Sequence, residues 1–88
     1  MEVKVENPSG KKLEDLGVDE WPIWQKEISE FDWYYDEQEI CYIIEGKAKV
    51  ETPEGTVSFE KGDLVTFPEG LNCKWKIIED VKKHYTLG

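Results

Sequence analysis

Residues 62–70 read Gly-Asp-Leu-Val-Thr-Phe-Pro-Glu-Gly, and this stretch decides the fold of the chain. Gly62 and Gly70 stand on either side of a short run of apolar and β-branched residues, and Pro68 closes that run. A run of this length between glycine and proline turns is typical of a β-strand.

The same pattern extends in both directions from this stretch. Further strands are expected at 3–5, 21–28, 30–35, 39–45, 47–52, 56–59, 73–78 and 83–87. A single helical turn is expected at 11–16, because Gly17 directly after it is a typical helix stop. Eight or so short strands with turns about every ten residues favour a sandwich or barrel. We therefore expect one all-β domain over residues 1–88, with residues 1–20 packing outside it or pairing at an edge.

Composition narrows the classes of function. The chain has 88 residues and a net charge of −9, which argues against nucleic-acid binding because a phosphate backbone requires a basic face. No apolar run approaches a membrane span and no signal-peptide pattern opens the chain, so a soluble cytoplasmic protein is expected. Abundant Glu and Lys without Arg is a trend of thermostable proteins. Exposed strand edges predict a homodimer.

Two motifs add a family resemblance. Gly62, Pro68 and Gly70 match G-x5-P-x-G-x2-H, and Glu39 with Gly46 matches the E-x6-G end of G-x5-H-x-H-x3,4-E-x6-G. These are the motifs of the cupin superfamily, and the sequence resembles a small single-domain cupin. The resemblance implies an RmlC-like jelly-roll β-barrel.

The histidines of those motifs are missing. Their first-motif positions fall on Trp33 and Tyr35 with the shorter spacer, or on Asp32 and Tyr34 with the longer one. The second-motif histidine falls on Cys73. Only the glutamate of the usual His-His-Glu-His set remains. We therefore expect no cofactor, with a divalent metal possible in principle but disfavoured.

Further residues resemble one branch of the cupins, the proteins grouped with the cupin domain of (S)-ureidoglycine aminohydrolase. They are Trp33-Tyr34, Gly62-Asp63, Pro68-Glu69-Gly70, Trp75 and residues 82–85. This resemblance implies, as an alternative, a divalent-metal-dependent hydrolase.

Four residues are candidates for chemistry or ligand contact on two predicted strands. Glu39 and Cys41 share one strand face, and Cys73 and Trp75 share another, because strand side chains alternate with a period of two. Glu39 is a candidate metal ligand, general base or polar ligand contact, or else a rim residue paired with a lysine. Cys73 is a candidate nucleophile, although buried thiols more often belong to a core. The two cysteines are expected as free thiols, with a disulfide possible if they face each other.

Aromatic residues are numerous for so small a chain. Trp33, Tyr35 and Trp75 are the best candidates for a ligand pocket because they lie at or beside the motif's ligand positions, whereas other aromatic residues are expected to fill the core. His84 is expected at a surface or interface, and Lys82 and Lys83 on a solvated face.

Two functions are left open, with a third alternative. The first is a metal-independent barrel that binds a small polar metabolite, with or without a reaction. The second is the ureidoglycine aminohydrolase-like hydrolase, with Glu39 as base or ligand. The third is a structural or interaction module, which requires a barrel filled by its own side chains.

Overall fold

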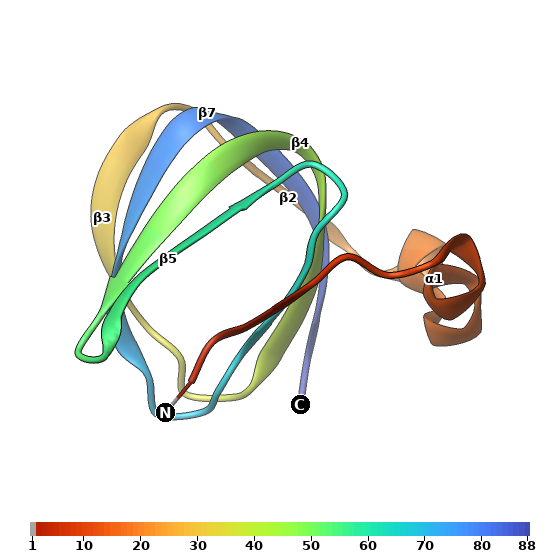
Figure 1. Ribbon diagram of the computed structural model, residues 1–88, viewed down its shortest axis with the longest axis horizontal. Coiled ribbons are helices and arrows are strands. Elements are labelled where there is room, and N and C mark those ends of the chain that lie inside the picture. The colour runs from red at the N-terminus through yellow and green to blue at the C-terminus, as the bar shows by residue number, and fades with distance from the viewer. Residues whose placement is uncertain (1) are drawn as a thin grey trace.

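A computed structural model describes residues 2–88 and shows one antiparallel β-barrel with a short helix beside it (Figure 1). The elements in chain order are β1 (Lys4–Glu6), α1 (Gly10–Leu16), a 3-10 helix (Val18–Glu20), β2 (Ile23–Lys26), β3 (Ser29–Tyr34), β4 (Glu39–Thr52), β5 (Gly55–Glu60), β6 (Leu64–Phe67) and β7 (Asn72–Leu87). All strand pairings are antiparallel. The predicted all-β cupin jelly roll is confirmed.

Two long strands, β4 and β7, form the centre of the barrel. They pair with each other along most of their length, and each curves so that its two halves take different outer neighbours (Figure 1). The first half of β4 pairs with β6 and the second half with β5. The first half of β7 pairs with β3 and the second half with β2. The curvature of β4 and β7 thus closes the sheet around one interior.

An irregularity in β4 corrects the prediction of two separate strands at 39–45 and 47–52. The pairing of β4 with β7 shifts register between Ile43 and Ala48, and Gly46 within this region has φ +94°. Bulges bend a strand without ending it. The same correction applies to 73–78 and 83–87, which form the single strand β7, and seven strands are present within residues 2–88.

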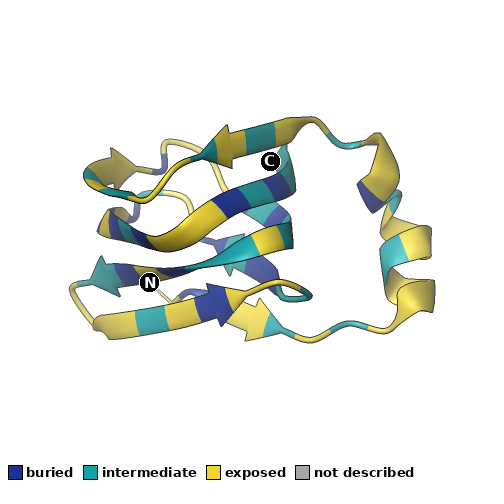
Figure 2. Cartoon of the chain, turned by 90° about the horizontal axis from the view of Figure 1, so that it is seen from above, coloured by how far each residue is buried: buried dark blue, intermediate teal, exposed yellow. Residues whose placement is uncertain are grey.

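In the N-terminal segment, β1 pairs with β6 at the edge of the sheet. Helix α1 begins after Ser9, whose hydroxyl accepts a hydrogen bond from the Lys12 amide, and ends at Gly17 in the left-handed conformation. Figures 1 and 2 place α1 to one side of the barrel. None of its residues is buried. Among residues 2–88 no helix is long and apolar enough to cross a membrane.

The core follows the alternation of the two long strands, with buried positions separated by more exposed ones along much of β4 and β7 (Figure 2), whereas three of the four residues of β6 are buried. Trp75 is 1% exposed and contacts Phe31, Phe59 and Phe67 with ring centroids 5.3–6.0 Å apart. Large aromatic side chains give this small barrel an interior of sufficient apolar area. They also form the wall of the cavity described next.

Candidate functional site

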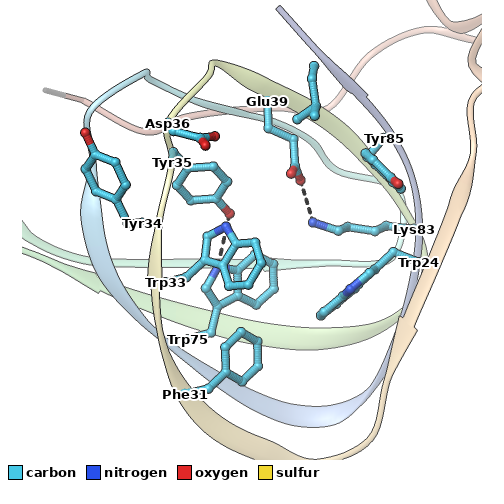
Figure 3. A pocket seen from close by; sticks show the side chains of 11 residues that line it. Trp24, Phe31, Trp33, Tyr34, Tyr35, Asp36, Glu39, Trp75, Lys83 and Tyr85 are labelled. Carbon is cyan, nitrogen blue, oxygen red and sulfur yellow. Dashed lines mark hydrogen bonds and ion pairs between the residues drawn. The ribbon is translucent and has the colours of Figure 1, made fainter.

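One end of the barrel interior is open, and a cavity of about 260 Å³ enters it (Figure 3). Its walls come from β2, β3, β4, β7 and the connection between β3 and β4. The lining residues are Trp24, Phe31, Trp33, Tyr34, Tyr35, Asp36, Glu39, Trp75, Lys83, Tyr85 and Leu87. Seven of these eleven are aromatic, so the cavity is an apolar cup with few charged groups. The barrel is therefore not completely filled by its own side chains.

A buried ion pair lies inside this cup. The ammonium nitrogen Nζ of Lys83 is 2.5 Å from the carboxylate oxygen Oε2 of Glu39, and the two residues are 4% and 7% exposed. Lys83 is opposite Ile43 in the pairing of β7 with β4, so its side chain and that of Glu39 extend from one inner face. Figure 3 shows the two side chains reaching toward each other across the pocket.

Two tryptophans hold the Lys83 ammonium on its other sides. The Nζ atom lies 4.8 Å from the ring centroid of Trp24 and 4.9 Å from that of Trp75. The negative face of an indole ring attracts a cation, and Trp is the strongest of the aromatic residues in this respect. A charge withdrawn from water must be compensated nearby. Here the compensation comes from one carboxylate and two rings.

Tyr35 orients the central tryptophan. Its hydroxyl oxygen accepts a hydrogen bond from the indole Nε1 of Trp75 at 3.1 Å, and its ring stacks on Phe67 with centroids 4.7 Å apart. Burial, and secondarily the nearby Glu39 charge, raises the pKa of the Tyr35 hydroxyl far above its usual range. The side chain is therefore a neutral phenol that can donate a hydrogen bond as well as accept one.

The rim of the cup combines exposed rings with a carboxylate. Trp33 and Tyr34 are 49% and 54% exposed, and Asp36 follows them in the chain. Trp33 contacts Phe31 and Tyr35 edge to face, so its ring continues the aromatic wall outward. Figure 3 shows Asp36 close to Tyr35 at the Glu39 side of the pocket.

The two candidate cysteines lie outside this cavity. Cys41 is fully buried in the core, and burial raises the pKa of its thiol to about 12. Cys73 lines a separate groove with Trp33, and its Sγ donates to the Trp33 carbonyl at 3.5 Å; burial raises its pKa to about 11. Both are free thiols. The expectation that they line the same pocket as Glu39 is corrected, because the neighbouring core side chains cover Cys41 and Cys73 opens to the other groove.

The side chains present do not fit the metal centre that the cupin motifs imply. Trp33 and Tyr35 stand where the shorter spacer places histidines, and Oε2 of Glu39 is engaged by an ammonium ion. Within residues 2–88 no group of three or more His, Cys, Asp and Glu side chains could hold an ion. The expectation that the protein uses no cofactor stays a prediction.

Lys83 is the buried pocket residue that the sequence did not predict, and the prediction that it lies on a solvated face is wrong. The signal was the alternation of Val81, Lys83 and Tyr85, which places the lysine on the inner face of β7. His84, on the opposite face, lies outside the cavity with its Nδ1 2.8 Å from the Trp21 carbonyl oxygen. Lys83 stands between the polar residues Lys82 and His84, and such a run is typical of a solvated face.

Comparisons with known proteins agree with this architecture. The chain is 60% identical to a DUF861 family protein from Thermotoga maritima, covering 99% of this chain and 100% of that one, with a TM-score of 0.97. It is 23% identical to the EutQ protein of Clostridium difficile, covering 74% of this chain and 52% of that one, with a TM-score of 0.69. A similar likeness holds for a putative ethanolamine utilization protein Q from Salmonella typhimurium, with 23% identity, coverage of 74% and 53%, and a TM-score of 0.68.

Among curated proteins no match is found. The family of EutQ-like cupin domains matches residues 13–85, which include β2 to β6 and all but the last two residues of β7. The chain therefore belongs to the family of EutQ-like cupin domains.

Proposed function

We propose that this chain is a metal-independent cupin that binds a small polar metabolite in the open end of its barrel. The observation that carries the proposal is the ion pair of Glu39 and Lys83, which is buried yet faces an open, aromatic cavity. A few placed polar groups in an otherwise apolar concavity are the usual composition of a small-molecule site.

A contribution to folding stability does not by itself explain why Glu39 and Lys83 form a buried ion pair. Replacing a buried ion pair by apolar side chains of similar volume is often neutral or stabilising. A pair that can exchange partners with a ligand, in contrast, supplies both a hydrogen-bond donor and an acceptor at one place. The hydrogen bond from Lys83 uses Oε2 of Glu39, and the carboxylate has a second oxygen that can accept from a ligand.

The four tryptophans allow a direct test. Trp24, Trp33 and Trp75 line the cavity, whereas Trp21 does not. We expect a mixture screen of small polar metabolites on chelator-treated protein to move the indole NMR signals of the three cavity tryptophans and leave that of Trp21 unchanged. Glu39→Gln combined with Lys83→Met should abolish the shifts. Binding that appears only after a metal is added, or no binding at all, would contradict the proposal.

A hydrolase of the ureidoglycine aminohydrolase type is the second candidate. It is favoured by Glu39, which is the buried one of the two acidic residues that line the cup and could serve as a general base. This candidate requires ammonia release from (S)-ureidoglycine that depends on added Mn²⁺ and disappears in Glu39→Gln. Activity retained in that variant would exclude the role of Glu39.

We further propose a thermostable, cytoplasmic homodimer. The strand β3 pairs only with β7 within residues 2–88, so its other edge is free in the described part of the chain. A free strand edge favours association. Light scattering coupled to size-exclusion chromatography should give twice the chain mass, and a monomer at micromolar concentration would rule the dimer out.

A further inference from the structure

We propose that the metabolite is a small organic ammonium ion, held at the rim of the cup by Asp36, Trp33 and Tyr34. This inference rests on the proposed ligand-binding function and names the chemical class of its ligand. It follows from the charges and from the rings of the lining.

The charges of the lining leave one carboxylate without a counterion. Three lining residues carry charge at neutral pH, namely Asp36, Glu39 and Lys83. Glu39 and Lys83 neutralise each other at 2.5 Å, whereas Asp36 takes part in no salt bridge among the described residues. The cavity therefore has a surplus of one negative charge. The net charge of −9 on the whole chain adds a field that attracts cations and repels anions.

The rings of the rim are suited to the same kind of ligand. Trp33 and Tyr34 line the same cavity as Asp36 and expose about half of their surface, and Phe31 lies next to Trp33 with ring centroids 6.4 Å apart. Aromatic faces together with a carboxylate form the usual recognition site for alkylammonium groups.

The deeper part of the cup already contains such an arrangement. The Lys83 ammonium lies within 5 Å of the centroids of Trp24 and Trp75 and contacts the Glu39 carboxylate. This inner arrangement demonstrates that the rings and carboxylates of the barrel hold an alkylammonium ion. At the rim the rings and the carboxylate recur, but the chain supplies no cation of its own within residues 2–88.

Other charge classes fit less well. An anion would compete with Glu39 for Lys83 and would approach Asp36, a second negative charge. A neutral apolar ligand would cover Asp36 without compensating its charge. A cation at the rim compensates the charge of Asp36 and also contacts the rings of Trp33 and Tyr34. The Lys83 charge does not oppose it strongly because Glu39 neutralises that charge.

Three probes of nearly the same shape isolate the charge. They are choline, its neutral analogue 3,3-dimethylbutan-1-ol, and the anion 3,3-dimethylbutanoate. Binding is followed by the indole signal of Trp33, with Trp21 as the internal reference. We expect choline to bind at least about tenfold more tightly than the alcohol, and the carboxylate not to bind.

Variants locate the site. Asp36→Asn should weaken choline binding several-fold, and Trp33→Leu should abolish it as followed by the signals of Trp24 and Trp75. Asp15→Asn is the matched control, because it removes the same charge from exposed helix α1 and should leave the affinity unchanged. An equal loss in Asp36→Asn and Asp15→Asn would mean general attraction and would overturn the rim site.

The outcomes separate this inference from the function on which it rests. Equal binding of choline and the alcohol, or preference for the carboxylate, overturns the ammonium ligand while cavity binding itself stands. Failure of all three probes overturns it too. The proposed function falls only if the wider metabolite screen also leaves Trp24, Trp33 and Trp75 unmoved.

Discussion

The indole Nε1 of Trp75 donates a hydrogen bond to the hydroxyl of Tyr35 at 3.1 Å, and this contact links the core to the pocket. Trp75 presents one ring to the Lys83 ammonium, which in turn contacts Glu39. Four residues from three parts of the chain therefore form one connected set. The orientation of the ion pair depends on the orientation of a core tryptophan.

Tyr35→Phe tests this connection. The substitution keeps the ring stacked on Phe67 but leaves the buried Trp75 N–H without a partner, and we expect a loss of about 1–2 kcal/mol in the free energy of unfolding. Urea denaturation measures it. Tyr34→Phe is the control, because Tyr34 is 54% exposed and should lose almost nothing. Equal effects of the two substitutions would mean that the hydrogen bond does not stabilise the core.

The ion pair itself can be analysed with a double-mutant cycle. Glu39→Gln leaves the buried Lys83 charge uncompensated, and Lys83→Met does the same to Glu39, so each should cost about 3 kcal/mol. The double variant should lose much less than the sum, because it leaves no unpaired charge. Unfolding free energies from urea titration give the coupling. Additive losses would show that the two charges do not compensate each other.

The positions of the scaffold residues could be predicted from sequence because each has a local cause. The two glycines and the proline of 62–70 specify turns, and alternation along 73–77 specifies an inner face. The same period of two places Glu39 on one face with Cys41, and the cupin resemblance implies that this face points inward. These features depend on neighbours a few residues apart, which the sequence displays directly.

The partner of Glu39 could not be predicted in the same way. Lys83 lies 44 residues further along the chain, and the two meet because β4 and β7 pair in a register that includes bulges near Gly46. A one-residue change of register would have turned Lys83 outward. Likewise, nothing local separates the core position of Cys41 from a pocket position, since both face inward. Only the arrangement of the strands around the barrel decides between them.

The raised thiol pKa values predict slow alkylation. With a pKa of about 11, roughly one Cys73 in 1000 is a thiolate at pH 8, compared with about one in ten for a free cysteine of pKa 9.0, so iodoacetamide should react about 100-fold more slowly. Cys41, with a pKa of about 12 and no exposed surface, should react more slowly still.

The alkylation rate of Cys73 should also depend on pH. Burial favours the neutral thiol, so the alkylation rate should rise about tenfold per pH unit until pH reaches the folded-state pKa of Cys73. Mass spectrometry of digested peptides separates the two sites, and protein unfolded in guanidinium chloride supplies the reference rate. A folded-state rate at pH 8 equal to that reference would show that the thiols are not shielded.

Gly46→Ala should be among the most damaging single substitutions in the chain. Gly46 has φ +94°, and a Cβ atom there would lie 2.1 Å from the backbone oxygen of Asp80, which cannot move without disturbing β7. Strain and overpacking together should cost about 3 kcal/mol or more. Gly10→Ala is the matched control, since a Cβ atom there meets nothing within 4 Å. Thermal denaturation compares the two variants. The register near Gly46 brings Lys83 toward Glu39, so Gly46→Ala should also weaken any ligand binding in the cup. A fully stable Gly46→Ala protein would refute the close approach of β4 and β7.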